Sequence, residues 1–213
     1  MSGEVGDKIS RILALDGKTQ RGNGNAERKA NHIVSAVDED GFCLGEELVD
    51  EKSNEIAVIP ELLKSINVKG HVVTIDAMGC QKDIARLIRE LGAHYVLGLK
   101  GNQGTLHGDV KLYFGDPGLL AGCAYHKVVD KAHGAVQIRE YWQTGDVAWL
   151  CQRKDWKGLS SIVMTRNTTI RGDKTTTDTR YFISSLPLGV EAAARAVRDD
   201  KTKGYLKELS ARV

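Results

Sequence analysis

The chain has 213 residues, of which 41% are hydrophobic and 27% charged, with a formal net charge of +2 at pH 7. This length is sufficient for one domain with a hydrophobic core and a smaller appended region. The charge is too small to identify a nucleic-acid-binding protein by itself. No apolar run approaches the roughly 18 residues of a membrane span, and the first ten residues lack the apolar segment of a secretory signal. The four cysteines are widely spaced and favour neither a disulfide framework nor a zinc site, so a cytoplasmic protein without a membrane partner is expected.

The N-terminal part of the chain predicts three strands. Residues 11–15, RILAL, form a short apolar strand that ends at Asp16, and a polar loop rich in Gly and Asn follows. Residues 32–37 and 42–49 predict two further strands that are joined by a tight turn. These two strands are therefore expected to form a hairpin.

The next segment predicts two helices that alternate with two strands. Apolar residues at helical spacing predict a helix between residues 53 and 66, in which Pro60 either begins the helix or kinks it. A strand over 71–75, a helix over 84–91 and a strand over 95–99 follow. The order β-β-β-α-β-α-β is that of an α/β ribonuclease-H-like core.

Beyond residue 100 the pattern changes to β-rich segments, which predict an antiparallel sheet inserted into the core. The segments read VQIREYWQ, VAWLCQ, SSIVMTRNTT and TRYFISSL, and a helix start follows at EAAARAVR. Three tryptophans recur every seven residues, but the surrounding pattern is that of strands, so packing in a core or on a sheet is the better interpretation. The predicted organisation is a catalytic core over residues 11–100, a β-rich insertion over 101–188 and a divergent C-terminal helix over 189–213.

Two aspartates, Asp16 and Asp76, each follow an apolar strand. An ionised carboxylate at such a place needs a cation, a hydrogen-bond network or solvent. For either residue alone a capping role is the simpler interpretation, and Asp76 could be the N-cap of the next helix. However, a helical crossover returns the fourth strand parallel to the first, which can bring both carboxylates to the same edge of the sheet. A divalent cation such as Mg²⁺ relieves the repulsion within such a pair and supports phosphodiester chemistry.

Four long strings of residues resemble a known family. LALDGKTQRG, VDEKSNEIAVIPELL, VVTIDAMGCQKDIA and YVLGLKGNQGTLH are similar to the H-repeat-associated insertion-sequence transposases of the DDE class, over roughly residues 12–186. The resemblance implies a ribonuclease-H-like core with a β insertion, and Asp16 and Asp76 as the first two catalytic, metal-binding acids. It also implies Mg²⁺ or Mn²⁺ as the cofactor, and DNA at element ends and at a target as the substrate. The implied chemistry is strand cleavage followed by attack of the freed 3′-hydroxyl on target DNA.

The sequence departs from the family pattern in two places. The family string HGR-x-E-x-R reads HGAVQIR here, so His133 and Arg139 match while Ala135 and Gln137 do not. After residue 198 the family continues with R-x-H-W-x-I-E-N, whose Glu supplies the third acid, whereas this chain reads DDKTKGYLKELSARV. The expectation is a truncated or frameshifted member that lacks the third acid and is inactive or impaired.

Several basic and polar residues are candidates for contacts with DNA phosphates. By position beside Asp16, or by resemblance, they are Lys18, Arg21, Lys100, Asn102, Gln103, His133 and Arg139. An ordinary solvated loop explains the first two as well, and a turn after a strand explains the next three. Glu55 is a candidate supporting acid behind the metal ligands, although helix capping explains it equally well.

Two alternatives to an active or impaired transposase remain open. One is a non-enzymatic relic that binds DNA or a partner and interferes with full-length relatives. The other is a ribonuclease-H-like nuclease that takes its last acid from elsewhere. A homodimer, or association with a full-length transposase, is a further expectation.

Overall fold

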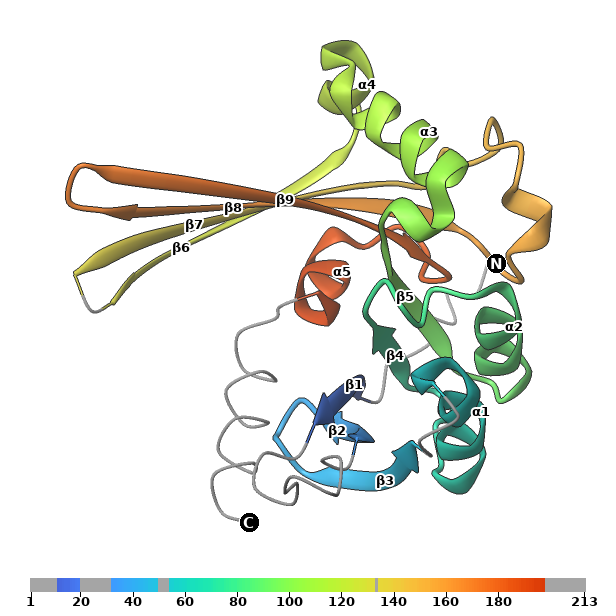
Figure 1. Cartoon of the computed structure of the whole chain (residues 1–213). Helices are drawn as coiled ribbons and strands as arrows, with labels where there is room; N and C mark the ends of the chain where they lie inside the picture. Colours follow the sequence, from blue (N-terminus) through green and yellow to red (C-terminus); the bar gives the residue numbers. More distant parts are fainter. Residues whose placement is uncertain (1–10, 20–31, 50–53, 133, 198–213) are drawn as a thin grey trace, which may run out of the picture. The chain divides into compact units, whose positions relative to one another are not determined.

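The computed structural model describes residues 11–19, 32–49, 54–132 and 134–197 (Figure 1). Contacts divide the chain into two compact units, with the boundary between Tyr95 and Val96. The predicted core extended five residues further, to residue 100. Its division from the insertion as functional domains stays a prediction, and residues 198–213 lie outside the described residues.

The first unit contains a sheet whose strands follow the order β3-β2-β1-β4. β1 pairs antiparallel with β2, β2 pairs antiparallel with β3, and β1 pairs parallel with β4. A parallel neighbour needs a crossover connection, and here the connection contains a helix. The strands are β1 (Ile12–Thr19), β2 (His32–Asp38), β3 (Cys43–Val49) and β4 (Val72–Ile75).

Two helices belong to this unit: α1 (Glu55–Ser65) in the crossover and α2 (Lys82–Glu90) after β4. α1 packs on β2 and β3 and also contacts α2 (Figure 1). Gly45 of β3 allows this close approach, since a Cβ there would lie 2.9 Å from a methyl of Ile66. Pro60 lies inside α1 rather than at its start, and the N-cap is Asn54, whose Oδ1 accepts from Ala57 N at 3.1 Å.

β1 is longer than the sequence predicts. It continues through Asp16 to Thr19, because β2 pairs with it residue by residue until His32 stands opposite Thr19. Asp16 therefore lies inside a strand and not at its end. The rest of the predicted loop lies outside the described residues.

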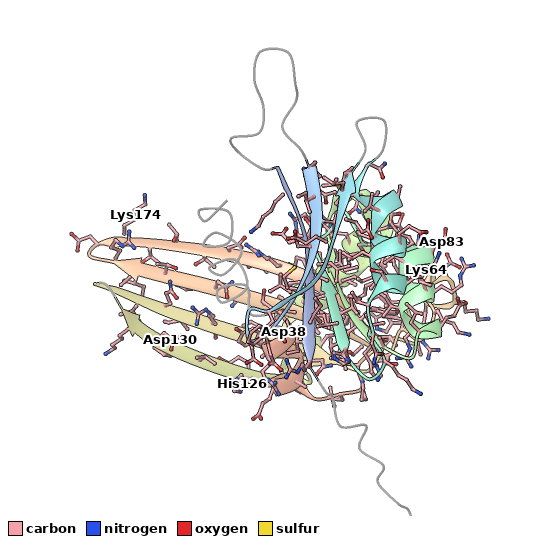
Figure 2. The ribbon with its side chains drawn as sticks, turned by 90° about the horizontal axis from the view of Figure 1, so that it is seen from below. Asp38, Lys64, Asp83, His126, Asp130 and Lys174 are labelled. Carbon is pink, nitrogen blue, oxygen red and sulfur yellow. The ribbon has the colours of Figure 1, made fainter. Side chains whose placement is uncertain are left out.

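The predicted turn between β2 and β3 is present. Gly41 N donates to Asp38 O at 3.0 Å, and Gly41 has a φ of 89°, in the region that glycine tolerates best. The buried Asp38 carboxylate, labelled at the end of β2 in Figure 2, pairs with Arg11 at 2.5 Å and accepts from Phe42 N at 2.9 Å. These contacts satisfy a charge that burial would otherwise make unfavourable.

The second unit contains an antiparallel sheet with the order β5-β9-β8-β7-β6. Its strands are β5 (His94–Leu99), whose first two residues precede the boundary, β6 (Ala124–Ala132), β7 (Ala135–Thr144), β8 (Ser161–Arg171) and β9 (Lys174–Ser184). Its α-helices are α3 (Gly104–Gly115), α4 (Pro117–Ala121) and α5 (Val190–Ala196), with 3-10 turns over Gly101–Gln103 and Arg153–Asp155.

Helices lie on both faces of this sheet (Figure 1). On one face, the rings of His107 and Phe114 of α3 lie 5.5 and 6.3 Å from the ring of Tyr181. On the other face, α5 contacts β6 and β7, and Glu191 lies 4.0 Å from His126. No described helix is both long and apolar enough to cross a membrane.

One predicted strand of this unit is wrong. VAWLCQ, residues 147–152, forms turns that lead into the 3-10 turn Arg153–Asp155. Val147 and Leu150 are buried three residues apart, and the ring of Trp149 stacks on Tyr113 with centroids 5.0 Å apart. The apolar content of the segment therefore reflects packing in a turn. Trp142 and Trp156 are buried, as expected for core or sheet-face packing.

Candidate metal centre

Asp16 lies in β1, and Asp76 directly follows the neighbouring parallel strand β4. Leu15 of β1 pairs with Ile75 of β4, and each aspartate is the next residue of its chain segment. Successive side chains of a strand point to opposite faces, and neighbouring strands lie about 4.8 Å apart. Because Leu15 and Ile75 are buried on one face, the two aspartates share the other face. The register thus brings together the pair that the sequence predicts.

The backbone after β4 orients the Asp76 carboxylate. Asp76 is exposed, and its Oδ1 accepts a hydrogen bond from Met78 N at 3.0 Å. The N-cap of α2 is Gln81, five residues later. Asp76 therefore closes a short turn at the end of the strand and is not the N-cap of α2, which was the alternative interpretation.

A further acid, Glu46, lies in the same row of the sheet as Asp16. Asp16 pairs with Ser35 of β2, Ser35 pairs with Glu46 of β3, and Ser35 Oγ donates to Glu46 Oε1 at 2.9 Å. The row therefore runs from Glu46 through Ser35 to Asp16 and on to Asp76, all on one face. Glu46 was not predicted as a site residue, because its place in this row depends on the register of two hairpin strands. The alternation of polar and apolar residues in β2 and β3 was the sequence signal from which this row could have been predicted.

Lys18 is a basic residue on the same face as Asp16. It lies two residues after Asp16 on β1, so both side chains point to the same side of the sheet. Its Nζ is shielded from solvent and has no hydrogen-bond partner in the described part of the chain. Burial lowers the pKa of Lys18, while the charges of Asp16 and Glu46 act to raise it.

Glu55 lies on the face of β1 opposite to the one that carries Asp16 and Lys18. It is the first residue of α1, and it forms an ion pair with His32 of β2. A Cβ built on Gly17 would lie only 2.1 Å from Glu55 Oε1, so the carboxylate occupies the space above Gly17. Gly17 follows Asp16 on β1, and successive residues of a strand point to opposite faces. Glu55 therefore lies on the side of the sheet that α1 covers. His32 was not singled out in the sequence.

The remaining predicted residues lie elsewhere. Lys100 and Asn102 are exposed and Gln103 is half-buried, at the 3-10 turn before α3 in the second unit. Arg139 is buried in β7, where it pairs with Asp130, labelled in Figure 2, and donates to Gln137 Oε1 at 2.5 Å. Its guanidinium therefore has internal anionic and polar partners. Arg21 and His133 lie outside the described residues.

Comparisons with known proteins identify the family. Residues 7–181 match the model of the transposase DDE domain, and the chain therefore belongs to this family. It is 37% identical over 183 residues to "Uncharacterized protein in dhlA 3'region" of Xanthobacter autotrophicus, which covers 85% of this chain and 62% of that protein.

Relatives in Escherichia coli carry transposase names. The chain is 36% identical to "Putative transposase YncI" of strain O157:H7, over 88% of this chain and 50% of the relative. It is 35% identical to "H repeat-associated putative transposase YhhI" of strain K12, over 88% of this chain and 52% of the relative. The chain thus spans about half to three fifths of the length of these relatives.

The chemistry of the donor set fits a divalent cation. Mg²⁺ prefers oxygen ligands and is often held by one or two carboxylates, with waters and substrate phosphates completing its shell. Asp16 and Asp76 supply such a pair on one face of the sheet. Within the described ranges no three His, Cys, Asp or Glu side chains are grouped so that they could hold a metal ion by themselves.

Proposed function

We propose that this chain carries the catalytic core of an insertion-sequence transposase, which cleaves and joins DNA strands with Mg²⁺ or Mn²⁺. The observation that supports the proposal is that Asp16 and Asp76 directly follow Leu15 and Ile75, which pair with each other on neighbouring parallel strands. A three-stranded antiparallel meander followed by a helical crossover to a parallel strand supports a ribonuclease-H-like core.

In the proposed reaction, Asp16 and Asp76 would be the carboxylate ligands of the divalent cation. When bound, the cation polarises the phosphodiester and lowers the pKa of the attacking hydroxyl or water. The Met78 N–H keeps one oxygen of Asp76 in place, so that the carboxylate is oriented before the ion arrives. The exposed Lys100 and Asn102 are proposed contacts for the DNA backbone, because exposed cationic and amide groups suit phosphate oxygens.

We further propose that catalysis by this chain is impaired. The candidate centre has two carboxylates, and a third acid that completes it is not grouped with them among the described residues. With fewer ligands, metal affinity and control of the second ion should both fall. The same observation favours the second candidate function, a relic that binds DNA or a full-length relative in the cytoplasm without cutting. The third candidate is a ribonuclease-H-like nuclease that takes its last acid from elsewhere.

The test is a nicking assay on DNA that carries element ends, with Mg²⁺ or Mn²⁺, for the wild type and the variants Asp16→Asn and Asp76→Asn. We expect weak, metal-dependent nicking that each substitution reduces by about a hundredfold or more, because each removes a ligand charge. Asp83→Asn is the matched control, since Asp83 is exposed on α2 and pairs with Arg86 (Figure 2).

The outcomes separate the candidate functions. Nicking that survives both substitutions would contradict the proposed metal centre. DNA binding that weakens steeply with salt, without nicking at any metal concentration, would support the relic. Sedimentation of the chain alone and with a full-length relative would test the proposed associations.

A further inference from the structure

The distal part of the antiparallel sheet in the second unit has one open face. The ends of β6, β7, β8 and β9 extend beyond the helices α3, α4 and α5 of this unit (Figure 1). Successive side chains of a strand point to opposite faces. The strand register therefore places on this face every second residue of Lys127–Lys131, Val136–Glu140, Arg166–Ile170 and Thr175–Thr179. None of these side chains is buried, and together they are called the open face.

The opposite face of the same strands differs from the open face, because its charges are paired with each other. Arg139 is buried there and pairs with Asp130. Asp178 accepts from Arg180 Nε at 2.7 Å. Two acids of the distal sheet therefore lie on the opposite face and have cationic partners of their own.

The open face carries three cations and one acid. The cations are Lys127, Lys131 and Arg166, and the acid is Glu140. Both lysines are exposed, and neither has an ion-pair partner within the part of the chain that the structure describes. Glu140 accepts a hydrogen bond from the Tyr125 hydroxyl at 2.8 Å, and the Arg166 guanidinium lies 5.0 Å from the centroid of the Trp142 ring. The charge of the open face therefore favours an anionic partner.

The uncharged side chains of the open face suit the sugar and phosphate groups of DNA. Hydroxyl groups, which can donate to phosphate oxygens, come from Thr168, Thr175, Thr177 and Thr179. Aliphatic side chains, which can contact deoxyribose, form the directly opposed pairs Val129–Ile138 and Val136–Ile170. Asn and Gln side chains, which recognise adenine with two hydrogen bonds, lie instead on the opposite face, at Gln137 and Asn167.

The width of the open face also favours contact with the DNA backbone. Four strands at a spacing of about 4.8 Å span roughly 15 Å. The major groove is only about 12 Å wide and admits a helix or a two-stranded ribbon. A four-stranded face is therefore too wide to enter this groove, and it would lie across the phosphates that border it.

We infer that the open face binds the sugar–phosphate backbone of duplex DNA without reading its sequence. The choice of DNA as the partner rests on the proposed function. The open face belongs to the second unit and contains neither Asp16 nor Asp76, so this binding needs no divalent cation.

The inference predicts effects of opposite sign on DNA affinity. Replacing both Lys127 and Lys131 by Gln should weaken binding by about 10- to 50-fold at about 0.1 M salt, because two phosphate contacts no longer release counterions. The dependence of log affinity on log salt concentration should become less steep by up to about 1.8. Glu140→Gln removes the one acid of the open face and should strengthen binding by roughly 2- to 5-fold.

The experiment is a fluorescence anisotropy titration of a short labelled DNA duplex of arbitrary sequence with the full chain. It is done in the presence of a metal chelator and at several salt concentrations. The matched control replaces Lys154 and Lys157 by Gln, because these exposed lysines of the same unit lie outside the open face. This control should leave most of the affinity in place, and circular dichroism checks that each variant is folded.

Several results would overturn the inference. Equal losses in the two double-lysine variants would show that only net charge matters, and the absence of binding by the wild type at low salt would remove the surface altogether. A preference for an element-end duplex that disappears with Lys127 and Lys131 would show that the open face reads sequence. A wild-type dimer in sedimentation that Val129→Asp converts to a monomer would assign the open face to a second copy of the chain.

The proposed catalysis is tested separately in the same set of proteins. Asp76→Asn should bind the duplex as the wild type does. If DNA binding depends on Lys127 and Lys131 but no nicking is seen, the proposed metal centre fails and the inference stands. If metal-dependent nicking is seen but binding does not depend on these lysines, the inference fails and the metal centre stands.

Discussion

Gly17 lies on β1 between Asp16 and Lys18, and its missing side chain makes room for Glu55. The Glu55 carboxylate occupies the position of a Cβ on residue 17 and pairs there with His32. The beginning of α1 is thereby attached to β1 and β2, on the face opposite the two candidate metal ligands. A glycine in a strand is otherwise unfavourable, by roughly 0.5–1 kcal/mol relative to alanine.

The effect of Gly17→Ala should therefore depend on Glu55. In the wild type the new methyl group displaces the Glu55 carboxylate from His32, and we expect a loss of about 1 kcal/mol in the free energy of unfolding. In a Glu55→Ala background the same change should be neutral or stabilising by about 0.5 kcal/mol. Urea unfolding of the four proteins measures both values. Equal costs in the two backgrounds would show that Glu55 does not occupy this space in solution.

At the scale of elements, a buried amide joins β7 to β8 and to the segment before α5. Gln143 is fully buried, and its Nε2 donates to Ser161 Oγ at 2.9 Å and to Pro187 O at 3.1 Å. Its Oε1 accepts from Gly189 N at 2.9 Å. This one side chain therefore satisfies polar groups of a strand and of the connection that leads into α5.

Gln143→Leu should destabilise the second unit. The substitution removes the hydrogen bonds to the buried Ser161 hydroxyl, to the Pro187 carbonyl and from the Gly189 N–H, each worth about 0.5–1.5 kcal/mol. We expect a loss of about 2–4 kcal/mol and faster hydrogen exchange at Gly189 and in α5. Thermal unfolding and amide exchange measure these changes, with Gln152→Leu, at a half-buried position, as the control. A loss of less than 0.5 kcal/mol, on the order of ordinary surface substitutions, would contradict the importance of this network.

At the scale of the whole molecule, two buried acidic groups couple stability to alkaline pH. Burial, with a smaller effect of Asp76, raises the pKa of Cys80 from its ordinary value of 9.0 to about 12. Burial also raises the pKa of Tyr95, and the nearby Cys80 adds to the rise. In the folded chain both groups hold their protons at a pH at which the unfolded chain releases them.

Stability should consequently fall as the solution becomes alkaline. A folded-state pKa above the unfolded value contributes stability that is fully present below pH 9 for Cys80 and is lost as the pH rises toward about 12. Each such group gives a slope of up to about 1.4 kcal/mol per pH unit in this window. Urea unfolding at pH 8, 9 and 10 should show the decline, with a shallower slope for Cys80→Ala. Equal slopes for the two proteins would contradict the burial of the thiol.

Much of the candidate centre could be predicted from local sequence. Apolar strands before Asp16 and Asp76, together with a helical crossover, were sufficient to expect the two acids as neighbours, and the position of Lys18 marked it as a basic neighbour. Glu46 and Ser35 were not predictable in the same way. Their place beside Asp16 depends on the register of β2 and β3, and a shift of one residue would move every side chain to the other face.

Local sequence patterns were sufficient for the family and for the elements β1, β2, β4, α1 and α2, because each of these depends on residues close together in the chain. The role of Asp16 and Asp76 as a metal-binding pair stays a prediction. The tertiary structure alone decided that β1 continues past Asp16, that Arg139 pairs internally with Asp130, and that Glu55 and Asp16 lie on opposite faces. These features depend on partners that are distant in the chain. Strand pairing and burial depend on the folded chain. They select among conformations whose free energies differ little by local propensity alone.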